Sequence, residues 1–275
     1  MSGLSTREDI FSIFNRSRFQ FQHFAYGYYP IVNSERNVKP HNRIFFPLEN
    51  PGGDKNYIEV ENGRFTMIPG KLYFIPAYAQ SVWRLDERLK FLSVHISVEI
   101  SPGIELFSNC SDILEIDAPE EMTPLLEISR SDQNNLLSKS ILMGSLALSI
   151  LVKILQHYDI NEFRGAIFLR KYNKLSQYLS MHSNAQTSVE DLAEIYGLSR
   201  IFFTRKFVSE TGITPKKLID RYTLRRCLDM MDQNLSIKEI SMELQFSNEF
   251  SFSRFFKRLT GESPRNWKKH HMKGI

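Results

Sequence analysis

The spacing of apolar and polar residues divides the chain into a β-rich first part and a helical second part. Between residues 57 and 99 apolar and polar positions alternate, as where Glu59 stands between Ile58 and Val60, and this period is typical of strands. From residue 119 onward, apolar residues recur three or four positions apart, which predicts helices. We therefore expect an α+β protein of two domains, with antiparallel strands in the first.

The β-rich part predicts several short strands joined by turns. Asn62-Gly63 is typical of a two-residue hairpin loop, and Pro69-Gly70 marks the next turn. Strands expected over residues 72–75 and 92–98 complete an antiparallel set. Several short strands with regular turns indicate a sandwich or a barrel.

Residues 119–158 change to a helical pattern. Apolar residues such as Ile141, Leu146 and Ile150 are more numerous here than one helix needs to cover a single face. Two explanations stay open, a helix that pairs with a second subunit and a helix packed on its own barrel. The most apolar run, residues 141–152, is too short to span a bilayer.

One helical unit is written twice between residues 188 and 267, at an offset of 48 residues before the inner turn and 49 after it. The copies share alternating phenylalanine and arginine positions and then a threonine-glycine pair: Phe203, Arg205, Phe207, Thr211 and Gly212 in the first, and Phe252, Arg254, Phe256, Thr260 and Gly261 in the second. Residues that cap backbone amides mark the expected helix starts: Ser188 with Asp191, Ser236 with Glu239, Ser199, Ser247, Thr214-Pro215 and Ser263-Pro264. Each copy therefore predicts a helix, a tight turn, a second helix that ends at glycine, and a third helix.

The arginine of each copy is expected to point outward. It lies about 200° round the helix from the first phenylalanine, because a helix has about 3.6 residues per turn. If Phe203 and Phe252 are buried, Arg205 and Arg254 face solvent. A helix, a tight turn and a second helix with an outward arginine form the helix-turn-helix arrangement that places a recognition helix in the DNA major groove.

Residues 168–267 resemble the AraC/XylS family of bacterial transcription regulators, most strongly in FSNEFSFSRFFKRLTGESPRNW. The resemblance implies two helix-turn-helix subdomains joined by one long helix, here residues 216–231, with the two recognition helices in successive major grooves. It implies double-stranded DNA, a small-molecule effector, a second subunit in a homodimer and RNA polymerase as partners. The DNA-binding positions that it implies are Ile201, Thr204, Arg205, Glu249, Phe250, Ser251, Ser253 and Arg254.

Some positions depart from the family's pattern. Gln245 replaces a turn glycine, and the resulting strain should be on the order of 1 kcal/mol. Ser241 stands where the family has a small alanine, and Thr223 and Cys227 stand where the linking helix usually has arginine and alanine. These departures concern the rigidity of the second turn rather than the fold.

In many members of this family a cupin-like sensor barrel precedes the DNA-binding half, and the segment PGKLYFIPA resembles its proline-glycine strand. The resemblance implies a sensor barrel over residues 1–118, a helical dimerisation or linker segment over 119–160 and a DNA-binding domain over 164–275, with 159–165 between domains.

Many cupins bind a metal through a paired His-x-His, whereas His23, His41 and His95 are isolated in this sequence, so we expect no metal. His95 lies on the polar side of a strand, where we expect it to face solvent rather than the interior. Arg43, Tyr73 and Trp83 are candidates for a small-molecule pocket, but aromatic residues are ordinary barrel filling. The ligand-binding residues are therefore left unassigned.

The charge is unevenly distributed. Residues 164–275 hold 20 Lys and Arg against 11 Asp and Glu, while residues 1–163 hold 15 against 20. The basic half carries the repeated unit, as expected of a domain that neutralises phosphates. Cys110 and Cys227 have no C-x-x-C partner, which argues against a zinc site or a disulfide framework. The N-terminus lacks a signal peptide, so we expect a cytoplasmic protein without a membrane partner.

We predict a sequence-specific DNA-binding transcription regulator, a ligand-responsive activator. One alternative is a cupin-type metabolic enzyme, although G-x-S-x-G, P-loop and H-E-x-x-H motifs are missing, so we assign no catalytic residue and no cofactor. The other is an interaction module that has lost DNA binding. A steep fall of DNA affinity with salt would separate the regulator from that module.

Overall fold

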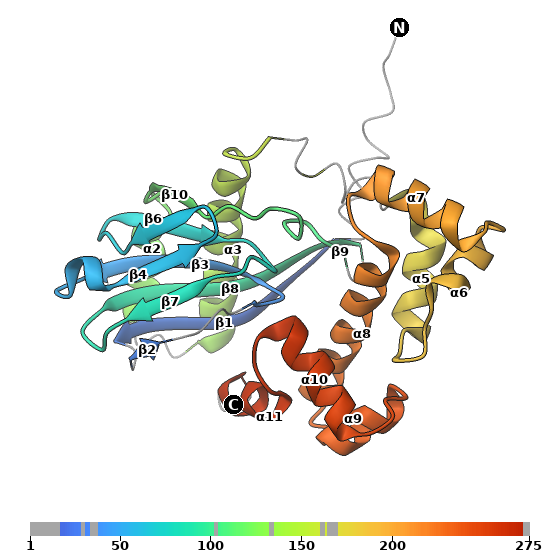
Figure 1. Ribbon diagram of the computed structural model, residues 1–275. Helices are drawn as coiled ribbons and strands as arrows, with labels where there is room; N and C mark the ends of the chain where they lie inside the picture. Colours follow the sequence, from blue (N-terminus) through green and yellow to red (C-terminus); the bar gives the residue numbers. More distant parts are fainter. Residues whose placement is uncertain are drawn as a thin grey trace, which may run out of the picture. The chain divides into compact units, whose positions relative to one another are not determined.

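The computed structural model describes residues 17–28, 31–33, 38–101, 104–131, 135–159, 163 and 170–271. The chain forms two compact units (Figure 1), one with most of the strands and the other with the C-terminal helices and the segment Val98–Asn109. The predicted α+β architecture is confirmed, with antiparallel sheets first and helices afterwards. The domain boundaries expected at residues 118, 160 and 164 stay predictions, and most of the expected linker lies outside the described residues.

The first unit contains two antiparallel sheets. The strands of the chain are β1 (Arg18–Tyr28), β2 (Val32–Asn33), β3 (Asn42–Glu49), β4 (Tyr57–Val60), β5 (Gly63–Thr66), β6 (Lys71–Ile75), β7 (Val82–Leu85), β8 (Lys90–Ser101), β9 (Ile104–Glu105) and β10 (Leu114–Asp117). β9 and the end of β8 lie in the segment Val98–Asn109 of the other unit. One sheet has the order β1-β8-β3-β6-β10, with β9 paired to β8, and the other has the order β2-β7-β4-β5. A 3-10 turn, η1 (Gly53–Lys55), precedes β4. The resemblance to a cupin barrel in particular stays a prediction.

An aromatic core fills the space between the two sheets. The ring of Phe45 on β3 lies 5.4 Å from Trp83 on β7 and 4.4 Å from Phe91 on β8. Alternate residues point to opposite faces of a strand, so Ile44 and Phe74, both fully buried, lie on the other face of the larger sheet. The helices α2 (Met122–Arg130) and α3 (Leu136–Leu155) lie beside that sheet in Figure 1.

Two details of the β-rich part differ from the sequence expectation. The hairpin between β4 and β5 is present, but Val60 pairs with Gly63, so its two-residue loop is Glu61-Asn62. The polar side of β8 does not face solvent, because Ser93 and Ser97 on that side are buried and His95 is half-buried. The alternating pattern marked a strand correctly, but it could not show that both of its faces are covered.

The three histidines that are isolated in the sequence lie together. The His95 ring lies 4.8 Å from that of His41 and 5.1 Å from that of His23. They come from β8, from the residue before β3, and from β1. Within the described part of the chain, no group of three or more metal-ligating side chains has an arrangement that could hold a metal ion.

The two faces of α3 differ. One face is buried through Ala147, Ile150, Leu151 and Ile154. The other leaves Ile141, Leu142 and Val152 between 45% and 64% exposed, and Leu136 and Leu137 are exposed at the first turn of the helix. Of the helices described, α3 is the one long and apolar enough to cross a membrane by length and composition. The core helix of a globular protein passes the same test, so this is weak evidence.

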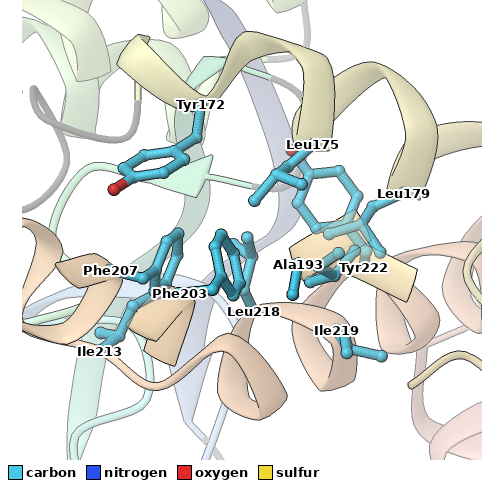
Figure 2. Packing of buried hydrophobic residues seen from close by; sticks show 11 residues of the cluster. Tyr172, Leu175, Leu179, Ala193, Phe203, Phe207, Ile213, Leu218, Ile219 and Tyr222 are labelled. Atoms are coloured by element: carbon cyan, nitrogen blue, oxygen red, sulfur yellow. The ribbon is translucent and has the colours of Figure 1, made fainter. Parts of the chain in front are cut away.

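The second unit contains the repeated sequence as helices. Its elements are η3 (Arg170–Tyr172), α5 (Asn173–His182), α6 (Val189–Ile195), α7 (Arg200–Thr211), α8 (Pro215–Asp232), α9 (Ile237–Glu243), α10 (Glu249–Thr260) and α11 (Pro264–His271). The predicted long helix between the two copies is α8, with 18 residues. Apolar residues of α5, α6, α7 and α8 form one core, in which Phe203 and Phe207 lie beneath Tyr172 (Figure 2).

Candidate DNA-binding surface

Capping side chains begin the first helix of each copy, as the sequence predicts. The backbone N–H of Asp191 donates to Oγ of Ser188 at 3.2 Å, and the Ser188 N–H donates back to the Asp191 carboxylate at 2.8 Å. Ser236 and Glu239 make the same two bonds, at 3.2 and 2.7 Å. The bond from Ser236 lowers the pKa of the Glu239 carboxyl. At the start of both α6 and α9, two backbone donors are therefore satisfied by side chains.

The second helices begin differently in the two copies. Ser199 caps α7 as predicted, accepting a bond from the Phe202 N–H at 3.4 Å. The prediction of Ser247 as the cap of α10 is wrong, because Asn248 is the N-cap and accepts from the Ser251 N–H at 2.8 Å. The second copy has one more residue between its turn and this helix, which moves the cap by one position.

The turns within the two copies have the same backbone geometry. Gly197 and Gln245 both adopt a left-handed conformation, with φ of 60° and 55°. The next N–H in each copy bonds back to the preceding helix, from Leu198 to the Ala193 carbonyl at 3.1 Å and from Phe246 to the Ser241 carbonyl at 2.9 Å. Gln245 therefore adopts the left-handed conformation of a turn glycine, which a side chain disfavours, and the size of the expected strain stays a prediction.

Each second helix ends at a left-handed glycine, as predicted. Gly212 has φ of 71° and Gly261 has φ of 82°. The preceding threonines, Thr211 and Thr260, are fully buried, and no role was predicted for them from the sequence. Their hydroxyls bond to carbonyls at 2.7 and 2.9 Å in their own helices, so they close the helix ends without leaving a buried donor unpaired. Their matched positions in the repeat were the signal that could have revealed this.

The alternating phenylalanines face the interior. Phe203, Phe207, Phe252 and Phe256 are at most 1% exposed. Phe256 also packs edge-on against Trp267 of α11, with ring centroids 5.7 Å apart. The arginine between each pair must therefore project from the opposite side of its helix, as the helical period predicts.

Arg205 and Arg254 are both exposed. Among the residues that the structure describes, Arg205 has no hydrogen bond or ion pair. The guanidinium of Arg254 lies 5.8 Å from the ring of Phe250, its neighbour one turn earlier. Ile201 and Phe250, at matched positions, are 68% and 71% exposed. Each second helix thus presents a cation beside an exposed apolar side chain.

The remaining candidate residues lie on the same two helices. Thr204 and Ser253 are half-buried beside the arginines, and Glu249 is exposed at the first position of α10. Ser251 differs, because its hydroxyl donates to the Asn248 carbonyl at 2.8 Å and accepts from the Asn248 N–H at 3.3 Å. The structure therefore groups the candidates into two patches, and it gives Ser251 a capping role.

Other arginines of this unit are engaged internally. Arg221 donates to the Ser108 carbonyl at 3.1 Å, and Arg226 donates to the Ser183 carbonyl. Arg225 pairs with Glu99 at 3.0 Å and with Asp229 at 2.9 Å. These cations stabilise the fold of the unit, whereas Arg205 and Arg254 have their donors available.

A buried carboxylate attaches the second copy to α8. Both Nη atoms of Arg258 on α10 lie 3.1 Å from Oδ2 of Asp220, and Lys216 lies 3.2 Å from its Oδ1. The Asp220 side chain is 7% exposed. This contact joins residues 38 positions apart and was not predicted from the sequence.

Part of the chain that carries this surface matches a known family of domains. Residues 192–270 match the helix-turn-helix domain family. The probable transcriptional regulator LumQ of Photobacterium leiognathi is 26% identical over 76% of this chain and 84% of its own length. The raffinose operon transcriptional regulatory protein RafR of Pediococcus pentosaceus is 25% identical over 49% of this chain and 50% of its own length.

Solved structures share the fold of the whole chain. A single-substitution variant of ToxT from Vibrio cholerae, in its apo form, superposes with a TM-score of 0.55 at 14% identity, covering 93% of this chain and 98% of that one. ToxT bound to unsaturated fatty acid superposes with a TM-score of 0.53 at 13% identity, covering 94% and 96%. At this identity the likeness concerns the fold alone.

The duplicated unit, its exposed arginines and these relatives define a DNA-binding transcription regulator. The C-terminal part of the chain is a helix-turn-helix domain of the AraC type, in agreement with the resemblance seen in the sequence.

Proposed function

We propose that both helix-turn-helix copies read bases of one DNA site, with α7 and α10 in successive major grooves. Two matched arginines, Arg205 and Arg254, are exposed and without a carboxylate partner among the described residues, and this observation carries the proposal. A guanidinium in the major groove can donate two bonds to guanine, the commonest specific contact. α8 spans roughly 27 Å at about 1.5 Å per residue. This length is comparable to the roughly 34 Å of one turn of DNA, so α8 can hold the two copies about one turn apart.

The neighbours of the arginines suit base contacts of other kinds. Ile201 and Phe250 offer apolar surface to thymine methyl groups, and the Glu249 carboxylate can accept from the amino group of cytosine. Thr204 and Ser253 carry hydroxyls that can bond to either partner. We assign Ser251 to orientation of the α10 N-terminus rather than to a base, because its hydroxyl already serves the cap.

A selection experiment tests the proposal without a known operator. The full chain is used to enrich binding sites from random duplex DNA, and affinity for the enriched site is then measured by fluorescence anisotropy. We expect a site with two conserved segments about one helical turn apart. A single short segment, or no enrichment, would contradict two-copy reading.

Salt dependence separates this function from an interaction module. Neutralised phosphates release counterions, so the logarithm of the affinity should fall linearly with the logarithm of salt concentration. A module that has lost DNA binding shows no such slope. The enzyme alternative gains no support from the relatives, which are named as regulators.

We also propose that α3 pairs two subunits. Its exposed residues Ile141, Leu142 and Val152 lie on the side opposite to its buried residues, and a monomer would leave them in water. Ile141→Glu should shift the protein from dimer to monomer in analytical ultracentrifugation, whereas Lys139→Glu, a neighbouring polar position, should not. A dimer that persists in Ile141→Glu would reject this interface.

We propose that the β-rich unit binds a small-molecule effector, and that the protein with its effector bound activates transcription. Support comes from the fold shared with ToxT, which has been solved with unsaturated fatty acid. A reporter placed behind the enriched site should rise in expression when the protein is present with purified RNA polymerase. A fall in expression would make the protein a repressor.

A further inference from the structure

A buried guanidinium lies between the two sheets of the β-rich unit. Arg43 on β3 is 3% exposed, and its Nη2 donates to Oγ of Ser81 at 3.2 Å. Its Cζ lies 4.9 Å from the centre of the Trp83 ring. Within the described ranges no carboxylate pairs with Arg43, and its Nε is buried without a hydrogen-bond acceptor.

This arrangement is unfavourable when nothing is bound. A buried charge is costly unless it is paired and hydrogen-bonded. Burial lowers the pKa of Arg43 to about 9, and no neighbouring charge offsets that effect. Arg225 of the helical unit differs from Arg43, because it pairs with two carboxylates. An anion beside Arg43 would supply the missing partner.

Three imidazoles extend the polar cluster from Arg43. His95 lies directly opposite Arg43 across β8 and β3, so both side chains project from one face of the sheet. His41 and His23 contact the His95 ring from either neighbouring strand. His41 is buried, whereas His23 and His95 are half-buried, so the cluster extends from a buried cation toward solvent.

We propose that Arg43 and these histidines bind the carboxylate of a small-molecule effector. A guanidinium binds a carboxylate through two parallel bonds, and each imidazole carries at least one N–H in either protonation state. The single permanent cation favours a monoanion over a dianion such as phosphate. Phe45 and Ile75, which are buried on the same face, favour a ligand with an apolar body. The inference rests on the ligand-responsive part of the proposed function and gives it a chemistry.

Isothermal titration of the full chain tests the site with four probes: propionate, octanoate, octanol and inorganic phosphate. We expect at least one carboxylate to bind and to raise the melting temperature. Octanol and phosphate should bind at least tenfold more weakly than the better carboxylate. Absence of binding by both carboxylates, equal binding of octanol, or tighter binding of phosphate would each overturn the proposal.

Variants then locate the binding. Arg43→Gln should lose carboxylate binding by at least tenfold, while its melting temperature without ligand should not fall, because a buried unpaired charge is removed. Arg64→Gln is the matched control, since Arg64 also lies over an aromatic ring, Tyr57, but pairs with Glu59 and is 55% exposed. It should bind the carboxylate as the original chain does. Undiminished binding by Arg43→Gln would overturn the assignment.

A second pair of variants covers the case in which Arg43→Gln does not fold. Arg43→Lys keeps the charge and should retain binding within tenfold, and His95→Gln should weaken it by about threefold or more. If neither changes the affinity relative to Arg64→Gln, the site is not at this cluster. DNA affinity is measured separately, so carboxylate binding without DNA binding rejects the proposed function alone, and the reverse result rejects this inference alone.

Discussion

The two helix-turn-helix copies share their framework and differ in what they expose. Capping box, buried phenylalanines, buried threonine and terminal glycine recur at matched positions. The outward arginine also recurs, but its neighbours change from Ile201 and Thr204 to Phe250 and Ser253. Since outward side chains distinguish base pairs, we infer that one framework serves two different base sequences.

The copies also differ in the contacts that attach each of them to α8. The first packs an apolar core against α5 and α8 through residues such as Leu175, Leu218 and Tyr222. The second has its own aromatic core around Phe252 and Phe256, and it is attached to α8 by the Asp220–Arg258 pair. The first copy should therefore respond mainly to lost apolar contacts, and the second also to lost charge.

Truncation of a core phenylalanine is expected to have the largest effect. Phe207→Ala and Phe256→Ala should each lower the free energy of unfolding by about 3–5 kcal/mol, because each leaves a cavity. Hydrogen exchange should show protection lost from α5–α7 in the first variant and from α9–α11 in the second. Phe202→Ala, at a 56% exposed position, should change stability by less than about 0.5 kcal/mol. A normal denaturant melt for Phe256→Ala would contradict its place in the core.

Removal of the buried carboxylate of Asp220 should have the second largest effect on stability. Asp220→Asn should destabilise the second copy by about 1–3 kcal/mol, because the charge-assisted bonds from Arg258 and the ion pair with Lys216 are lost. Asp229→Asn removes a carboxylate that is 44% exposed, against 7% for Asp220, and should cost about 0.5 kcal/mol or less. Equal effects in urea melts of the two variants would mean that Asp220 is not an anchor.

Substitution of Arg205 and Arg254 is expected to distinguish the two copies on DNA. Arg205→Ala and Arg254→Ala should each weaken binding by about 1–3 kcal/mol and relax base preference in different segments of the site. Arg64→Ala in the β-rich unit removes the same charge and should leave anisotropy titrations unchanged. If each recognition variant weakens all duplexes equally, these arginines hold phosphates instead of reading bases.

Exchange of the two turn residues should give the smallest effects, with opposite signs. Gly197→Gln should cost about 1 kcal/mol, and Gln245→Gly should gain up to about that amount, because both positions are left-handed. A Cβ added at Gly197 meets no atom within 4 Å, so conformation alone decides the cost. Thermal melts of the pair would contradict this account if both substitutions shifted stability in the same direction.

Local signals in the sequence predicted the helical unit well. Capping serines, terminal glycines and the phenylalanine period act within a few residues, so they fix helix ends and faces before any tertiary contact forms. The exception at Ser247 has a local cause, since one inserted residue passes the cap to Asn248. The role of each candidate base contact stays a prediction, because free side chains on a surface do not identify their partner.

Contacts distant in the sequence escaped prediction for a physical reason. Alternation along β8 shows two faces but not which of them is covered, so His95 was placed toward solvent. The His23–His95–His41 cluster and the Asp220–Arg258 pair each join different elements, and no local period records them. The sequence indicated an antiparallel fold, while strand order and the position of Arg43 required the structure.

Hydroxyl-radical footprinting on the enriched duplex tests most directly whether both copies bind one DNA site. The original chain should protect two tracts about one helical turn apart, roughly 10 base pairs. Arg205→Ala should weaken protection at one tract and Arg254→Ala at the other. A single tract that both variants affect alike would contradict the central claim.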